Sequence, residues 1–182
     1  MKFNKDMLKL YAITDRQWLK DKTLPQAVEE AIKGGATFIQ LREKDTPYDQ
    51  FKAIAIEVKK ITDKYNIPFV INDNVELCKE IDADGVHVGA DDMSVKKARE
   101  ILGENKIVGG TARTLERALK AYNEGADYLG IGAVFNTTTK SGTTRMTKEL
   151  AQEINKTVNI PTVAIGGINK ENASKLKDYG VS

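Results

Sequence analysis

Short apolar runs alternate along the whole chain with longer segments whose apolar residues recur at helical spacing. The apolar runs, several of them bounded by proline or glycine, predict seven strands. The longer segments predict amphipathic helices, the first of which opens with a threonine cap and an early proline at 23–25. We expect strands over residues 8–14, 37–44, 69–71, 85–89, 106–110, 127–131 and 161–165. We expect helices over residues 23–34, 48–65, 75–81, 94–102, 114–125, 147–158 and 169–179.

This strict alternation of strand and helix predicts a parallel sheet, which is either doubly wound or closed into a barrel. The central strands of a doubly wound sheet are almost uniformly apolar, because helices cover both faces. Several strands here carry a polar residue or a glycine at alternate positions, which favours the tapered interior of a barrel. We therefore expect an α/β fold of the TIM (β/α)8 barrel type, formed by a single domain over residues 1–182.

Only seven βα units are evident, and the chain stops at 180–182, where an eighth strand would begin. Barrels of this type rarely run below about 200 residues. We therefore expect that the eighth strand and helix are missing from this chain. Either the chain is truncated at its C-terminus, or residues outside this sequence complete the barrel.

Composition and charge narrow the classes of function. The 28 basic and 26 acidic side chains nearly balance, so bulk charge gives no case for a nucleic-acid or membrane partner. The single cysteine, Cys78, fits a reducing compartment, and we interpret it as a buried, inert thiol. No apolar run reaches membrane-spanning length, and the N-terminus lacks the apolar core of a signal peptide. We expect a soluble, cytoplasmic protein, for which a homo-oligomer is allowed.

Candidate chemistry begins in the predicted strand at 37–44. Gln40, Arg42 and Lys44 occupy every second position there, so an amide, a guanidinium and an ammonium would share one face. The intervening Ile39 and Leu41 would point into an apolar layer. A strand face with two cations and an amide either holds an anion or faces water.

Further polar residues follow the carboxyl ends of the other predicted strands. These clusters are Lys44 with Asp45, Asn72 with Asp73, Asp91 with Asp92, Thr111, Thr137 to Lys140, and Gly166-Gly167. In a barrel such strand ends converge on one face, which is where active sites lie. The alternative is that βα loops are generally polar and that aspartate and asparagine cap helices, and we interpret Ser94 and Asn169 as caps only. That alternative explains one or two sites well but six coincident clusters poorly.

Two of the clusters suggest a metal site. Asp73 and Asp92 end successive strands, so in a closed barrel they would lie within reach of one ion. Two carboxylates without a histidine or cysteine partner suit a hard cation, Mg²⁺ above all. Asp91 competes with Asp92 for this role, and spacing does not choose between them. A Mg²⁺ ion beside the cations Arg42 and Lys44 would be typical of a site that binds pyrophosphate or triphosphate.

A second phosphate site is expected near the end of the chain. Gly166-Gly167 precedes a predicted helix, and bare N–H groups at a helix N-terminus bind phosphate. Thr137-Thr138-Thr139-Lys140 would add hydroxyls and a cation to the same face. The only histidine, His87, is interpreted as a packed core residue without a catalytic role. Two phosphate-binding regions and Mg²⁺ together predict a reaction that joins or cleaves phosphorylated small molecules.

Taken together, these motifs resemble the thiamine-phosphate synthase family in order and spacing from residue 8 to the end. The motifs are Tyr11-Ala12-Ile13-Thr14-Asp15, Gln40-Leu41-Arg42-Glu43-Lys44, Ile71-Asn72-Asp73, Gly85-Val86-His87-Val88-Gly89 with Asp91-Asp92, Thr137-Thr138-Thr139-Lys140 and Ile165-Gly166-Gly167-Ile168. The resemblance implies a TIM-barrel transferase that couples 4-amino-5-hydroxymethyl-2-methylpyrimidine pyrophosphate to 4-methyl-5-(2-phosphoethyl)thiazole. Pyrophosphate would depart first, leaving a pyrimidine-methylene cation that the thiazole nitrogen attacks.

The resemblance also implies roles for individual residues. It assigns the pyrimidine pyrophosphate to Gln40, Arg42, Lys44, Asn72 and Lys140, with Arg42, Lys44 and Lys140 as the catalytic cations. It assigns Mg²⁺ to Asp73 and Asp92, and the thiazole phosphate to Thr137, Thr138, Thr139 and the Gly167 backbone. Thr111 stands where the family usually has a serine that contacts the pyrophosphate substrate, and it keeps the hydroxyl.

Three departures from the family pattern leave alternatives open. Arg113 replaces a histidine, the stretch 141–146 differs from the usual loop, and the family continues into an eighth strand that contributes to the thiazole-phosphate site. One alternative is a thiazole tautomerase-like paralogue, against which Arg42, Lys44, Asn72 and Asp73 argue. The other is a non-catalytic phosphometabolite-binding protein or an inactive fragment.

Overall fold

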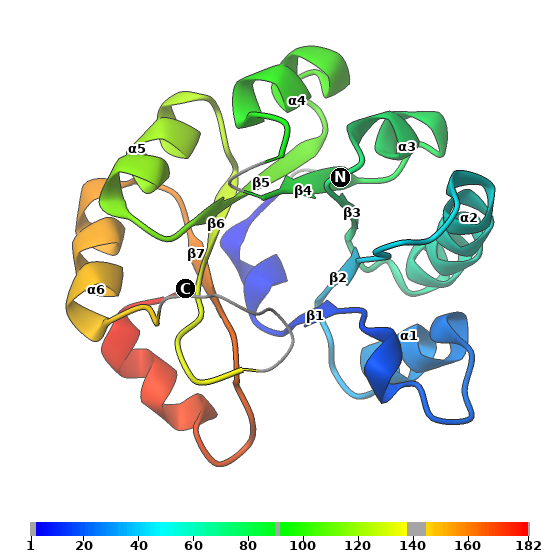
Figure 1. Cartoon of the computed structure of the whole chain (residues 1–182), viewed down its shortest axis with the longest axis horizontal. Helices are drawn as coiled ribbons and strands as arrows, with labels where there is room; N and C mark the ends of the chain where they lie inside the picture. Colours follow the sequence, from blue (N-terminus) through cyan, green and yellow to red (C-terminus); the bar gives the residue numbers. More distant parts are fainter. Residues whose placement is uncertain (1–2, 90–91, 138–144, 182) are drawn as a thin grey trace. The chain divides into compact units, whose positions relative to one another are not determined.

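The computed structural model describes residues 3–89, 92–137 and 145–181. Over these residues, strands alternate with helices along the chain (Figure 1). The strands are β1 (Tyr11–Ile13), β2 (Phe38–Leu41), β3 (Phe69–Asn72), β4 (Gly85–Val88), β5 (Ile107–Ala112), β6 (Tyr128–Gly132) and β7 (Thr162–Ile165). The α-helices are α1 (Leu24–Lys33), α2 (Tyr48–Tyr65), α3 (Val75–Glu80), α4 (Val95–Leu102), α5 (Leu115–Asn123) and α6 (Lys148–Thr157). The 3₁₀ helices are η1 (Lys5–Leu8), η2 (Arg16–Trp18) and η3 (Ala173–Tyr179).

The chain divides into two compact units. The first consists of Met1–His87 and Glu100–Ile107, and the second of Val88–Arg99 and Val108–Ser182. In the first unit the strands lie in the order β1-β2-β3-β4, and each neighbouring pair is parallel. In the second unit the order is β5-β6-β7, again with parallel pairs. The predicted parallel arrangement of consecutive strands is therefore confirmed within each unit.

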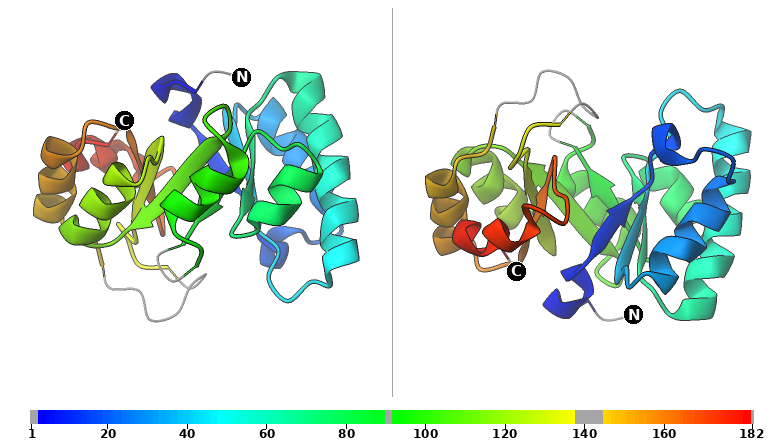
Figure 2. Two further views of the ribbon diagram at one scale, coloured as in Figure 1. Left: turned by 90° about the horizontal axis from the view of Figure 1, so that it is seen from above. Right: turned by 90° about the horizontal axis from the view of Figure 1, so that it is seen from below.

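The core of the first unit lies on both faces of its strands. Phe38 and Leu41 of β2 are fully buried, and so are Phe69 and Ile71 of β3. Helices α1, α2 and α3 lie on one side of these strands (Figure 1). Helices α1 and α2 also pack against each other, as both views in Figure 2 show.

Helix α1 illustrates how the sequence specifies a local element. Thr23 and Gln26 form a reciprocal capping box at its N-terminus, and Pro25 lies in its first turn. Leu24, Val28 and Ile32 recur every four residues and are buried, so one face of the helix packs on the strands. Full burial of each such side chain contributes about 1.5–3 kcal/mol relative to exposure.

The core of the second unit is built around β6. Tyr128, Leu129 and Ile131 are fully buried, and α5 and α6 lie on one side of the strands (Figure 1). Gly109 of β5 makes room for the Tyr128 ring, since a Cβ atom on Gly109 would lie 2.2 Å from Cζ of that ring. A glycine is therefore required at position 109, where β5 pairs with β6.

Two strands, β1 and β2, are each four residues shorter than predicted from the apolar pattern. The strand predicted over 8–14 is β1 alone, because Leu8 belongs to η1, which Asn4 caps by accepting from the Asp6 N–H. The strand predicted over 37–44 ends at Leu41, the last residue of β2 in register with β3. Arg42 and Lys44 therefore lie in the loop after β2, and strand alternation does not set the direction of their side chains.

The last predicted helix also differs from the structure. An α-helix over 169–179 was expected with Asn169 as its cap, whereas the helix is the 3₁₀ helix η3, which begins at Ala173. The Asn169 side chain accepts from the N–H groups of Glu171 and Asn172 in a local turn that precedes it. The Gly166-Gly167 pair is thus not adjacent to a helix N-terminus, and phosphate binding there stays a prediction. Within the described part of the chain, no helix is long and apolar enough to cross a membrane.

Candidate functional site

Three polar residues of the first unit converge where β2 and β3 end. Asn72 is the last residue of β3, and Asp73 follows it directly. The Lys44 ammonium lies 3.5 Å from Oδ2 of Asp73, and Nδ2 of Asn72 donates to the same oxygen at 2.5 Å. A cation from the loop after β2 therefore forms one cluster with an amide at the end of β3 and the carboxylate that follows it.

The backbone of Asp73 is held in an uncommon conformation. Its φ of +62° lies in the left-handed region, which is uncommon for residues with a Cβ atom. The Asp73 N–H donates to the carbonyl of His87 on the neighbouring strand at 2.8 Å. This hydrogen bond fixes the backbone of the turn after β3, from which the carboxylate reaches Lys44.

Gln40 is the buried member of the predicted anion-binding set. Its side chain is only 3% exposed, and Nε2 donates to the Tyr11 hydroxyl at 2.7 Å. The Tyr11 ring packs on the Phe38 ring, with 4.6 Å between the centroids. The amide of Gln40 is therefore oriented from the neighbouring strand β1, as a buried polar group requires. The expectation that Ile39 and Leu41 enter an apolar layer is confirmed, because both are buried.

Arg42 is tied to the end of β1 through its backbone. Its N–H donates to Oγ1 of Thr14 at 2.8 Å, and the Thr14 hydroxyl donates to the Arg42 carbonyl at 3.3 Å. The Thr14 N–H in turn donates to the Gln40 carbonyl at 3.0 Å. Thr14 thus continues the pairing of β1 with β2 by one residue beyond the strand. These hydrogen bonds fix the backbone of Arg42, whose side chain is half-buried.

The first-unit cluster offers ligands for both an anion and a hard cation. Lys44 provides positive charge and donors for phosphate oxygens, and Arg42 lies two residues before it in the same loop. Asp73 provides carboxylate oxygens of the kind that Mg²⁺ prefers. Among the described residues, no group of three or more histidine, cysteine, aspartate or glutamate side chains gathers into a metal site. Any ion held by Asp73 would therefore take its remaining ligands from elsewhere, such as water or substrate phosphates.

The second unit contributes Asp92 and Thr111. Asp92 is exposed, and its N–H donates to the Gly89 carbonyl at 3.4 Å in the turn that follows β4. Thr111 was expected after the end of a strand, but it lies inside β5, opposite Gly130 of β6. Its side chain is half-buried at this position, next to the carboxyl end of the strand.

Gly166 and Gly167 pack directly against the segment after β6. Both have positive φ angles, of 99° and 65°. A Cβ atom on Gly166 would lie 2.5 Å from Cβ of Ala133, and one on Gly167 would lie 2.2 Å from the Asn136 carbonyl oxygen. The Phe135 N–H also donates to the Gly166 carbonyl at 3.0 Å. The two predicted parts of the second phosphate site, Gly167 and the segment leading to Thr137, therefore lie side by side.

Four of the predicted candidates lie outside the described residues. These are Asp91, Thr138, Thr139 and Lys140. Thr137 is described and is half-buried, directly after the segment that packs on Gly167. The choice between Asp91 and Asp92 as a metal ligand stays a prediction.

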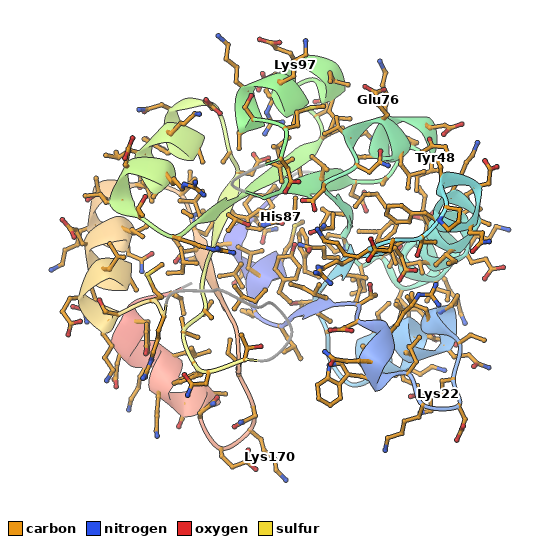
Figure 3. All side chains as sticks on the ribbon, viewed as in Figure 1. Lys22, Tyr48, Glu76, His87, Lys97 and Lys170 are labelled. Carbon is orange, nitrogen blue, oxygen red and sulfur yellow. The ribbon has the colours of Figure 1, made fainter. Side chains whose placement is uncertain are left out.

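The two residues that were given no catalytic role are buried. His87 lies in β4 with 8% of its surface exposed, and Figure 3 shows it among the strands, whereas Tyr48 and Lys22 project from the periphery. Cys78 is fully buried on α3, and burial raises the pKa of its thiol to about 12. A thiol with this pKa is protonated at neutral pH, which agrees with an inert packing role.

Two residues of this region were not singled out from the sequence. Thr14 ties the backbone of Arg42 to β1, and Glu43 pairs with Arg16 of η2 across 27 positions of the chain. The alternation of polar residues in the sequence predicted a role for Arg42 and Lys44, the two neighbours of Glu43, and none for Glu43 itself. Its position between two cations in the Arg42-Glu43-Lys44 run was the only available signal.

The sequence is similar to a known protein family and to curated proteins of that family. The family model described as thiamine monophosphate synthase matches residues 10–182. A curated thiamine-phosphate synthase from Clostridium acetobutylicum is 49% identical over 173 residues, which span 95% of this chain and 82% of the relative. One from Caldanaerobacter subterraneus subsp. tengcongensis is 52% identical over 167 residues, which span 92% of this chain and 78% of the relative.

Solved structures agree with the sequence relatives. A thiamine phosphate pyrophosphorylase from Pyrococcus furiosus aligns with a TM-score of 0.87 and 42% identity, covering 97% of this chain and 84% of that one. FabK from Thermotoga maritima aligns with a TM-score of 0.72 but only 22% identity, so it shows the fold alone. The likeness confirms the expected α/β fold of the TIM-barrel type, with seven parallel strands over the described residues. The expectation that residues outside this sequence complete the barrel with an eighth βα unit stays a prediction.

Proposed function

The chain belongs to the thiamine monophosphate synthase family, and from this premise we propose that it is a transferase that makes thiamine phosphate. The observation that carries the proposal is the 49% identity to a curated synthase across 95% of this chain. The substrates would be 4-amino-5-hydroxymethyl-2-methylpyrimidine pyrophosphate and 4-methyl-5-(2-phosphoethyl)thiazole. The products would be thiamine phosphate and pyrophosphate.

The proposed reaction breaks one bond and forms one. The bond between the pyrimidine methylene carbon and the pyrophosphate oxygen breaks, and its electron pair leaves with the pyrophosphate. The lone pair of the thiazole nitrogen then forms the new bond to the methylene cation. Negative charge develops on the leaving group, so catalysis consists mainly of stabilising that charge and aligning the two rings.

In the first unit, Gln40, Arg42, Lys44 and Asn72 would bind the pyrimidine pyrophosphate. The contact of Lys44 and Asn72 with one carboxylate oxygen supports this assignment, because it gathers a cation and an amide donor at one point. The backbone tie of Arg42 to Thr14 supports it as well, since it fixes where the guanidinium starts. Fixed donors and cations stabilise developing charge better than mobile ones.

Mg²⁺ is the proposed metal, with Asp73 and Asp92 as the residues that would hold it. The described donors fit this ion, because both are carboxylates and Asp73 lies beside the cation Lys44, where phosphate oxygens would also bind. When bound, Mg²⁺ would neutralise charge on the departing pyrophosphate. Lys44, Asn72 and the Asp73 turn would orient the pyrophosphate at the same point.

In the second unit, Thr111 and Lys140 would contact the pyrophosphate substrate, and Thr137, Thr138, Thr139 and the Gly167 backbone would hold the thiazole phosphate. Gly167 packs closely against Asn136, and Thr137 follows Asn136 in the chain. This packing supports a shared phosphate site for Gly167 and Thr137. Backbone N–H groups in a turn with positive φ form concave anion sites even without a helix N-terminus.

The cations Arg42, Lys44 and Lys140 are the proposed catalytic residues. Removing one preorganised donor from a site of this kind costs about 10²–10³ in kcat. We further propose that the protein works in the cytoplasm on these two small molecules, without a nucleic-acid or membrane partner. A homo-oligomer is compatible with this function and can be checked by light scattering.

The proposal is tested by leaving out one component at a time. Purified protein is incubated with both substrates and Mg²⁺, and the products are separated by liquid chromatography with mass detection. We expect thiamine phosphate only when both substrates and Mg²⁺ are present. Conversion of the thiazole phosphate alone into an isomer would favour the tautomerase-like alternative. Binding of pyrophosphate without any product would favour the non-catalytic alternative.

A further inference from the structure

Glu43 has a buried carboxylate in the middle of the proposed anion-binding loop. Its side chain is 0% exposed, whereas its neighbour Lys44 is half-exposed. Oε2 of Glu43 accepts from Nε of Arg16 at 2.8 Å and from Nη2 of Arg16 at 2.6 Å. The hydroxyl of Thr46 donates to the same oxygen at 3.2 Å. One carboxylate oxygen thus joins η2 to Glu43 and Thr46, which lie on either side of Lys44 in the loop.

Stability alone is a weak reason for this arrangement. The second oxygen, Oε1, is buried and has no hydrogen-bond partner among the described residues. A buried carboxylate oxygen without a partner is costly. Even fully buried ion pairs can often be replaced by apolar residues at no cost in stability, and here the partner Arg16 is half-exposed. The buried carboxylate is therefore better explained by the position in which it holds the 42–46 loop.

The ion pair complements the backbone tie made by Thr14. Thr14 fixes the first residue of the loop, Arg42, through two hydrogen bonds. The Glu43 carboxylate fixes the next residue from the side of Arg16 and holds Thr46 at the far end of the loop. Connecting loops without such ties are mobile. Lys44 lies between the two fixed ends.

The same ion pair keeps the charge of Glu43 away from the pyrophosphate. Glu43 is flanked by two cations in the sequence, so an exposed carboxylate there would offset their charge. The carboxylate is instead turned inward onto Arg16, a cation from a different segment. Arg42 and Lys44 can then act on an anion with less opposition from their own loop.

We propose that Glu43 is a positioning residue for pyrophosphate binding, which acts through Arg16 and Thr46 to hold the 42–46 loop with its two cations presented to the ligand. The inference rests on the proposed function, in which Arg42 and Lys44 bind the pyrophosphate substrate. It adds Glu43 and Arg16, neither of which touches the substrate in this account.

The test compares Glu43→Gln with the unchanged protein, using inorganic pyrophosphate and Mg²⁺ in isothermal titration calorimetry. Gln has nearly the shape of Glu but lacks the charge that Arg16 requires. We expect the Kd for pyrophosphate to rise about 10-fold or more, because small misplacements of binding groups carry large costs. In the coupled reaction, the KM for the pyrimidine substrate should rise, while the KM for the thiazole phosphate stays within about two-fold.

Two further variants make the test specific. Arg16→Gln removes the other partner at a half-exposed position and should reproduce the effect of Glu43→Gln, so it decides the question if Glu43→Gln does not fold. Glu30→Gln removes another ion-paired glutamate of the same unit, which lies 2.5 Å from Lys22 and is half-exposed. Figure 3 shows Lys22 at the periphery, and this control should leave pyrophosphate binding unchanged.

The inference is overturned if a folded Glu43→Gln or Arg16→Gln protein binds pyrophosphate as the unchanged protein does. It is also overturned if both KM values and kcat change by the same factor, which would indicate a general structural effect. Binding of pyrophosphate by the unchanged protein without formation of thiamine phosphate would contradict the proposed function only. The calorimetric comparison of the variants would still judge the role of Glu43.

Discussion

The ammonium of Lys44 lies 3.5 Å from Oδ2 of Asp73, the oxygen to which Asn72 also donates. This contact joins the loop after β2 to the turn after β3. Lys44 is half-exposed, so the pair itself contributes little to stability. In the proposed function, the contact places a ligand for Mg²⁺ next to a ligand for phosphate, so that one pyrophosphate can engage both.

Asp73→Asn tests the metal assignment. The substitution keeps the shape of the side chain but removes the charge that would attract Mg²⁺. We expect the Mg²⁺ concentration for half-maximal activity to rise about 10-fold or more, in line with the effect of weakening a metal site. Initial rates measured over a Mg²⁺ series check this expectation.

Asp63→Asn provides the matched control for the metal assignment. Asp63 is an exposed carboxylate of the same unit that pairs with Lys59 on α2. Its replacement should leave the Mg²⁺ dependence unchanged. An Asp73→Asn protein with the same Mg²⁺ dependence as the unchanged protein would remove Asp73 from the metal site.

Lys44→Met tests the cation on the other side of the contact. Methionine keeps much of the length of the side chain but cannot stabilise the departing pyrophosphate, so kcat should fall about 10²-fold. Steady-state kinetics with the pyrimidine pyrophosphate as the varied substrate provide the measurement. Lys52→Met, at a lysine that pairs with Glu80 at 2.5 Å, should change kcat little. Equal effects of the two substitutions would contradict a specific role for Lys44.

Stability at acidic pH should depend on Glu29. The Tyr65 hydroxyl and the Lys64 ammonium donate to its Oε1 at 2.7 and 3.0 Å and lower the pKa of the carboxyl from 4.5 to about 2. Because the pKa is lower in the folded state, the stabilisation is present above pH 4.5 and is lost as the pH falls toward 2. Glu29→Gln should therefore lower the urea midpoint at pH 6 and lower it less at pH 3. A difference of the same size at both pH values would contradict this linkage.

The order of the elements could be predicted because it depends on local periodicity. Capping at Thr23 and the four-residue repeat of Leu24, Val28 and Ile32 are visible in the sequence and recur in α1. The end of β2 could not be predicted in the same way. The alternation of Gln40, Arg42 and Lys44 continues in the sequence, but pairing with β3 stops at Leu41 and Asp45 adopts a positive φ of 58°.

The end of the chain shows the same limit of local patterns. Asn169 is a good helix cap by residue type, yet its side chain closes a turn on Glu171 and Asn172. The 3₁₀ helix starts only after this turn, at Ala173. A residue that can cap a helix can equally stabilise a turn, and the sequence does not distinguish the two outcomes.

The candidate site was accessible from the sequence only in part. Lys44, Asn72 and Asp73 were singled out because each follows a strand, and parallel neighbouring strands bring such residues together. The pair of Glu43 with Arg16 was not predictable, because it joins two loops 27 positions apart and no periodicity relates them. Burial of a charged side chain is a tertiary property, which only the structure reveals.

The most direct test of the proposed function follows both substrates and both products in one experiment. Phosphorus NMR of the purified protein with the pyrimidine pyrophosphate, the thiazole phosphate and Mg²⁺ follows the release of free pyrophosphate, and proton NMR of the same sample follows the conversion of the thiazole ring into that of thiamine phosphate. The proposed reaction predicts that pyrophosphate and thiamine phosphate appear in equal amounts and at the same rate. Release of pyrophosphate without thiamine phosphate, or no change in either substrate, would contradict it.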